Sequence, residues 1–175
     1  MQKKNDQFLW TAVSGSDPAG CSSDGLKTII AAHRKFGTTS MLPTFISDTI
    51  DNMKNIIDVA NQALEEDISG MVGLHLEGPY LNFDRKGVHL PSMIRPVDDG
   101  VAELYKSLKN GVLMVTLAPE KVPSDFISDL VKANILVYAG HSDATYEQIK
   151  FALAEGLNGF THLYNAMSPL TNREP

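Results

Sequence analysis

The chain has 175 residues, of which 43% are hydrophobic and 21% are charged. This length and balance are typical of one globular domain and exclude an intrinsically disordered protein. The net charge of -6 and the lack of any basic run argue against nucleic acid as a partner, because an acidic surface repels a phosphate backbone. No apolar stretch approaches the roughly 18 to 20 residues that a membrane span needs.

The amino-terminal residues and the cysteine content bear on the compartment. The start of the chain lacks the apolar centre of a signal peptide, so we expect a cytoplasmic protein with no membrane partner. The single cysteine, Cys21, cannot form an internal disulfide, and there is no cysteine cluster to bind a metal. A metal site in this chain would therefore use histidine and carboxylate ligands.

Short apolar segments alternate along the chain with segments of helical periodicity, which predicts an α/β fold with a parallel sheet. The predicted strands are five buried segments, at residues 39–45, 71–77, 113–117, 135–139 and 159–164. The predicted helices have apolar residues at helical spacing within residues 26–36, 50–64, 101–108, 127–131 and 146–153. A long connection runs from residue 78 to about 98, and loops of that length in compact α/β domains are usually functional.

Polar residues mark the starts of three of these helices. Side-chain oxygens at a helix start accept hydrogen bonds from the free backbone N–H groups of the first turn. On this basis we expect the caps of the first, second and fifth helices to be Asp24, Ser47 or Asp48, and Ser142 respectively.

Three predicted strands bring metal-binding residue types to their carboxyl ends. Glu77 ends the second strand, His141 follows the fourth, and His162 lies in the fifth. In parallel α/β folds these ends form the rim at which ligands bind. One Glu and two His form a ligand set found in hydrolytic zinc sites. Taken singly, each histidine is better explained as a hydrogen-bonded core residue than as a ligand, and on the joint spacing alone both interpretations stay open.

Four groups of motifs occur in order along the chain and give a more specific indication. They are His75-Leu-Glu-Gly-Pro-Tyr with Lys86-Gly-Val-His89, Thr116-Leu-Ala-Pro-Glu120, Gly140-His-Ser-Asp-Ala, and Thr161-His-Leu-Tyr-Asn-Ala-Met with Arg173-Glu-Pro175. Together they resemble the N-acetylglucosamine-6-phosphate deacetylase family of the amidohydrolase superfamily, over about residues 24–175. The resemblance implies hydrolysis of N-acetylglucosamine 6-phosphate to glucosamine 6-phosphate and acetate, as part of amino sugar catabolism.

Residue by residue, the resemblance implies that Glu77, His141 and His162 bind one divalent metal ion, zinc. The segment 7–15 contains no His-x-His pair that would bind a second ion. The resemblance also implies sugar-phosphate contacts by residues of the loops, which are His89, Asn165, Ala166 and Arg173. A neutral His89 can hydrogen-bond a hydroxyl or phosphate oxygen, and the planar fork of Arg173 suits a phosphate.

The resemblance implies a (β/α)8 TIM-type barrel with a small β-sandwich, and we expect this chain to hold only part of that plan. We predict a partial barrel of about six of the eight strands, without the sandwich, in which residues 1–23 are a poorly matched segment and residues 24–175 form the incomplete barrel domain. The catalytic general acid and base, an Asp in the family, is expected beyond Pro175, so the chain reads as a truncated form.

Three functional interpretations follow from the sequence. The first is the deacetylase, with an amino sugar phosphate as its partner and a homodimer as its family's assembly. The second is a non-catalytic sugar-phosphate or metal-binding fragment of the same family. The third is another amidohydrolase that acts on a cyclic amide or a different N-acyl amine, against which the phosphate-directed Arg173 argues.

Overall fold

The computed structural model describes residues 12–13, 20–170 and 172. Its parallel sheet contains six strands, which are β1 (Ala12–Val13), β2 (Thr44–Ile46), β3 (Gly73–Glu77), β4 (Val112–Leu117), β5 (Leu136–Ala139) and β6 (Gly159–Phe160). One α-helix lies between each strand and the next, namely α1 (Ser23–Arg34), α2 (Ile50–Glu65), α3 (Val101–Tyr105), α4 (Phe126–Lys132) and α5 (Tyr146–Ala154). The predicted α/β class with a parallel sheet is confirmed.

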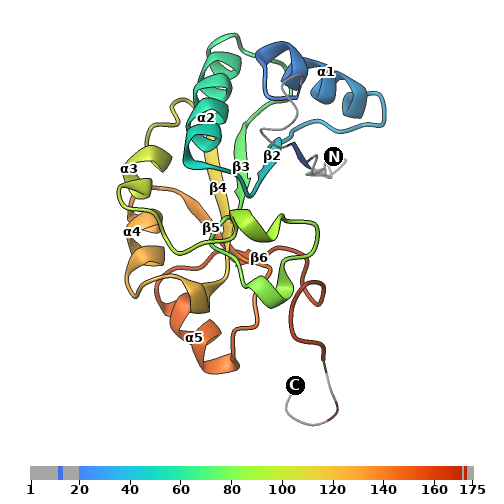
Figure 1. Cartoon of the computed structure of the whole chain (residues 1–175). Coiled ribbons are helices and arrows are strands. Elements are labelled where there is room, and N and C mark those ends of the chain that lie inside the picture. Colours follow the sequence, from blue (N-terminus) through green and yellow to red (C-terminus); the bar gives the residue numbers. More distant parts are fainter. Residues whose placement is uncertain (1–11, 14–19, 171, 173–175) are drawn as a thin grey trace, which may run out of the picture.

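The strands lie side by side in the order in which they occur along the chain, from β1 to β6. Because crossovers between parallel strands are right-handed, a sheet whose order never reverses carries its connecting helices on one face. The helices indeed follow one another past the sheet, from α1 and α2 through α3 and α4 to α5 (Figure 1). The carboxyl ends of all the strands therefore meet at one edge, where the connections to the helices begin.

The centre of the sheet is the pairing of β3 with β4, in which Gly73 lies opposite Val112 and Glu77 opposite Thr116. Every residue of β3 is buried. The strands approach so closely at the start of this pairing that a Cβ atom on Gly73 would lie 1.9 Å from the carbonyl oxygen of Val112. The glycine is therefore required for the two strands to keep their register.

Apolar side chains from the strands and the helices form one core. Its fully buried members include residues of α1, α2, β3, β4 and α4, such as Leu26, Ile56, Ile57, Leu74, Leu76, Val115, Leu117 and Leu130. In the described part of the chain, no helix is both long enough and apolar enough to cross a membrane.

The structure corrects the predicted helix caps. The capping side chains are those of Ser22, Thr49 and Thr145, each of which accepts a hydrogen bond from a backbone N–H of the first turn. The predictions of Asp24, Ser47 or Asp48, and Ser142 were wrong by one to three residues. Several polar residues precede each helix, and the exact start depends on the path of the preceding loop, which local sequence does not determine.

Candidate metal centre

Glu77 is the last residue of β3, and two imidazoles converge on its carboxylate. The Oε1 atom accepts hydrogen bonds from His141 Nε2 at 3.1 Å and from His162 Nε2 at 2.8 Å. Burial alone would raise the pKa of Glu77, but the hydrogen bond from His141 and the neighbouring imidazole charges outweigh burial and lower the pKa to about 2. The carboxylate is therefore ionised, which is the state that binds a cation.

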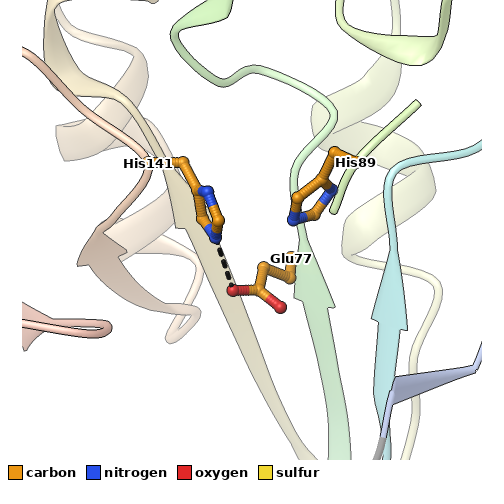
Figure 2. Close-up of side chains that lie close together, drawn as sticks. All are labelled: Glu77, His89 and His141. Carbon is orange, nitrogen blue, oxygen red and sulfur yellow. Dashed lines mark hydrogen bonds and ion pairs between the residues drawn. The ribbon is translucent and has the colours of Figure 1, made fainter. Parts of the chain in front are cut away.

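His141 follows β5, and its backbone conformation is strained. Its φ angle of 48° is left-handed, which costs a residue other than glycine about 1–3 kcal/mol. The imidazole donates through Nδ1 to the carbonyl oxygen of Arg85 at 2.8 Å, so that Nε2 points at Glu77 (Figure 2). A backbone carbonyl that orients the imidazole through Nδ1 is typical of metal-binding histidines.

The protonation of His141 follows from these two contacts. Burial would lower the pKa of His141, but the hydrogen bonds to Glu77 and to the Arg85 carbonyl outweigh burial and raise it. In this arrangement each ring nitrogen faces an oxygen acceptor, to which it donates when protonated. A cation that binds at Nε2 has to displace the proton that this nitrogen donates to Glu77.

His162 reaches the same carboxylate from the loop after β6. Its φ angle of 55° is also left-handed, and its ring centroid lies 5.3 Å from that of His141 at an angle of 88°. The His162 side chain is 43% exposed, whereas that of His141 is 6% exposed. The sequence prediction grouped Glu77, His141 and His162, and the structure brings these three side chains together.

His89 lies beside His141, in the long connection between β3 and α3. Its ring centroid is 4.6 Å from that of His141, and the potential ligand atoms of Glu77, His89 and His141 all lie within 4.8 Å of one another (Figure 2). The sequence assigned His89 to the substrate and missed this proximity. The motif Lys86-Gly-Val-His89 marks the residue as functional, but its distance from Glu77 depends on how the connection folds back.

One ring nitrogen of His89 is engaged and the other is not. The Ser47 backbone N–H donates to Nδ1 at 3.3 Å, and the Ser47 hydroxyl lies 2.8 Å from the same nitrogen. The Nε2 atom is buried and has no hydrogen-bond partner among the described residues. Burial, followed by the charge of His141, lowers the pKa of His89 to about 4, so the ring is neutral at pH 7.

His75 lies in the same strand as Glu77, but its ring nitrogens contact hydroxyl groups of the neighbouring strands. Its Nδ1 lies 3.0 Å from Thr44 Oγ1 and its Nε2 lies 2.7 Å from Thr116 Oγ1. A further hydrogen bond at 2.7 Å connects the Thr116 hydroxyl to that of Thr161. Burial lowers the pKa of His75 to about 3, so it is neutral and connects β2, β3 and β4 through hydroxyl groups.

Glu77, His141 and His162 offer donor types that suit a divalent cation, namely a carboxylate oxygen and two imidazole nitrogens. With ligand atoms about 2.0–2.2 Å from zinc in a tetrahedral site, neighbouring ligand atoms lie roughly 3.3 Å apart. The two O···N distances, 3.1 and 2.8 Å, are close to that value. Loss of the shared protons and small side-chain movements would open the space that the ion needs.

The remaining predicted substrate residues lie on the loop after β6 or outside the described residues. Asn165 is exposed, and the carbonyl oxygen of Ala166 accepts a hydrogen bond from the Ser142 N–H at 3.2 Å. This bond connects the loop after β6 to the loop that carries His141. Arg173 lies outside the described residues.

The chain is similar in sequence to amino sugar phosphate deacetylases. The chain is 42% identical to an N-acetylgalactosamine-6-phosphate deacetylase from Shewanella over 150 residues, which are 86% of this chain and 38% of the relative. It is 37% identical to an N-acetylglucosamine-6-phosphate deacetylase from Haemophilus influenzae over 86% of this chain and 40% of the relative.

A solved structure of a deacetylase is also similar to this chain. A substituted N-acetyl-D-glucosamine-6-phosphate deacetylase from Mycobacterium smegmatis, in complex with N-acetyl-D-glucosamine-6-phosphate, superposes with a TM-score of 0.84 at 29% identity and covers 96% of this chain and 44% of that one. The chain thus spans about two fifths of the length of these relatives. The model of the amidohydrolase family matches residues 2–172, and the chain belongs to that family.

Proposed function

We propose that this chain is the metal-binding and phosphate-binding part of an enzyme that hydrolyses N-acetylglucosamine 6-phosphate to glucosamine 6-phosphate and acetate. The observation that carries the proposal is the convergence of His141 and His162 on one carboxylate oxygen of Glu77. The names of the relatives support N-acetylated hexosamine 6-phosphates as the substrate class.

A zinc ion bound by Glu77, His141 and His162 would polarise the acetamide carbonyl and lower the pKa of a water molecule. His89 orients the substrate beside these residues. Because Nδ1 of the neutral ring accepts the Ser47 N–H, the ring proton is on Nε2, which can donate to a substrate oxygen. Because His141 and His162 contact the Glu77 carboxylate directly, whereas Nε2 of His89 has no hydrogen-bond partner among the described residues, we assign His89 to the substrate rather than to the ion.

The phosphate and the proton transfers need further residues. We assign the phosphate to Arg173 and the sugar to the loop that carries Asn165 and Ala166. We place the general acid and base, an Asp, outside this chain, in the additional length that the relatives have.

We also infer that the sheet is part of a (β/α)8 barrel. In this chain, residues 24–175 form the incomplete barrel domain. The uninterrupted strand order and the placement of the helices along one side support a closed barrel rather than a doubly wound sheet. In such a barrel the strand ends that carry Glu77, His141 and His162 face one mouth.

Metal analysis of substituted chains tests the site. We expect the purified chain to bind about one equivalent of zinc, and Glu77→Gln and His162→Asn each to lower zinc affinity by a factor of at least about 10, because each removes one of three ligands. His33→Asn, a change on α1 at a histidine far from the site in sequence, is the matched control and should bind zinc like the unsubstituted chain. Unchanged zinc binding in both site variants would contradict the assignment.

Substrate binding and turnover separate the functional alternatives. With zinc present, we expect N-acetylglucosamine 6-phosphate to bind more tightly than unphosphorylated N-acetylglucosamine, and N-acetylgalactosamine 6-phosphate serves as the epimeric comparison. Equal binding of the phosphorylated and unphosphorylated sugars would contradict the phosphate site. Acetate release by this chain above a metal-free control would exclude the non-catalytic fragment, whose support is the chain's coverage of about two fifths of its relatives.

A further inference from the structure

We propose that Glu120 is a positioning residue that holds His141 in its metal-binding orientation. Glu120 lies just after β4, within a short 3-10 helix (Pro119–Lys121), and it is not among the metal or substrate residues assigned above. The inference rests on the proposed metal site and adds to it a residue that acts through hydrogen bonds.

The Glu120 carboxylate accepts three hydrogen bonds from two different loops. Its Oε1 atom accepts from Asn82 Nδ2 at 2.9 Å and from the Asp143 backbone N–H at 2.7 Å, and its Oε2 atom accepts from the Ser142 hydroxyl at 2.7 Å. Ser142 and Asp143 directly follow His141 in the chain, whereas Asn82 belongs to the connection after β3. One half-buried carboxylate thus fastens the loop after β5 to the loop after β3.

The same two loops hold His141 on both sides. The Asn82 backbone N–H donates to the His141 carbonyl oxygen at 2.8 Å, and the Arg85 carbonyl accepts from His141 Nδ1 at 2.8 Å. Arg85 also pairs with the Asp143 carboxylate at 2.8 Å. The backbone and the ring of His141 are therefore fixed by residues whose own positions depend on Glu120.

His141 needs this support because its left-handed backbone conformation, with φ of 48°, is not favoured by a residue other than glycine. Residues 142 and 143 must turn in one particular way for Nε2 to reach Glu77. The bonds from Ser142 and Asp143 to Glu120 specify that turn. Without these hydrogen bonds, residues 142 and 143 can adopt another backbone conformation. Nε2 of His141 then no longer points toward the metal position.

Zinc affinity of the 175-residue chain tests the proposal, with zinc alone as the probe and a chromophoric chelator as competitor. We expect Glu120→Ala to weaken zinc binding about 10- to 100-fold, the range for residues that orient metal ligands. Glu120→Gln should restore affinity to near that of the unsubstituted chain. Its amide oxygen can accept the Asn82 and Asp143 bonds, and its amide group can donate to the Ser142 hydroxyl, which is able to accept.

Two controls separate positioning from charge and from stability. Glu147→Ala removes a carboxylate from the first turn of α5, where it pairs only with Lys150 among the ion pairs of the described residues, and it should leave zinc affinity unchanged. Thermal unfolding in chelator identifies a general loss of stability, and affinities are compared well below the unfolding midpoints. If Glu120→Ala does not fold, Ser142→Ala, which removes one of the three bonds, should show a smaller loss of affinity.

The outcomes distinguish this inference from the proposed function. Unaltered zinc affinity in a folded Glu120→Ala, or in Ser142→Ala where only that variant folds, would overturn the positioning role while leaving the metal site intact. Equal losses in Glu120→Gln and Glu120→Ala would also overturn it, because charge rather than hydrogen bonding would then carry the effect. Failure of the unsubstituted chain to bind zinc would instead refute the metal site itself.

Discussion

His75 lies within β3 and His141 just after β5, and their environments shift the pKa values of the two imidazoles in opposite directions. Both are buried. His75 has threonine hydroxyls at its two nitrogens, and burial lowers its pKa to about 3. His141 has a carboxylate and a carbonyl at its nitrogens, and these acceptors raise its pKa despite burial. The hydrogen-bond partners, rather than burial, therefore decide the direction in which each pKa shifts.

This difference predicts separate effects of substitution. His75→Leu should lower the free energy of unfolding by about 2 kcal/mol, because it removes a buried hydrogen-bond partner from the Thr44 and Thr116 hydroxyls. Zinc binding should persist, since threonine hydroxyls occupy both ring nitrogens of His75. Urea unfolding and metal analysis measure the two effects, and His141→Asn is the comparison that should lose zinc. A His75→Leu chain that folds but binds no zinc would show that His75 belongs to the site.

At the scale of elements, the sheet depends on the close approach of β3 and β4. Gly73 faces the backbone of Val112, with no room for a side chain. Gly37, which follows α1, has a φ angle of 94° but no atom within 4 Å of its Cβ position. The two glycines therefore serve different purposes, one for space and the other for backbone conformation.

Alanine at these two positions should have unequal effects. Gly73→Ala should destabilise the chain by more than about 3 kcal/mol, because β3 and β4 must separate to accommodate a methyl group. Gly37→Ala should cost only about 1–2 kcal/mol, which is the cost of a left-handed conformation. Chemical denaturation of both variants measures the difference. Equal destabilisation would mean that the strands can part without loss of packing.

The strands and helices could be predicted from sequence where the local spacing of apolar residues determines them. The apolar pattern of 71–77 predicted a buried strand, and β3 lies within that range. The predicted helix reaching Phe36 was too long, because α1 ends at Arg34 and Phe36 is 87% exposed. An apolar residue at helical spacing does not reveal that the chain has already left the helix.

At the scale of the whole molecule, the site joins loops that follow three strands. The predicted strands indicated Glu77, His141 and His162 as candidates, and the resemblance to the deacetylases implied that they bind a metal. The sequence did not predict the proximity of His89 or the role of Glu120. Both depend on how the connection after β3 folds across the mouth of the sheet, which is a tertiary property.

Metal binding should therefore stabilise the whole molecule. At a free zinc concentration of about 100 times the Kd, binding contributes about 2.7 kcal/mol. This corresponds to a rise in Tm of roughly 5–10 °C for a chain of this size. The increment should shrink as pH falls, because the raised pKa of His141 lets protons compete for Nε2. Scanning calorimetry with zinc and with EDTA tests this, and identical Tm values would contradict it.

The wide spacing of the three ligands along the chain has a consequence for biosynthesis. His141 lies 64 residues and His162 lies 85 residues after Glu77. An ion bound by these three residues would therefore connect several strand–helix units of the folded chain. On the ribosome, the carboxylate emerges long before the last imidazole, so the proposed capture of an ion would be a late event that requires an assembled sheet.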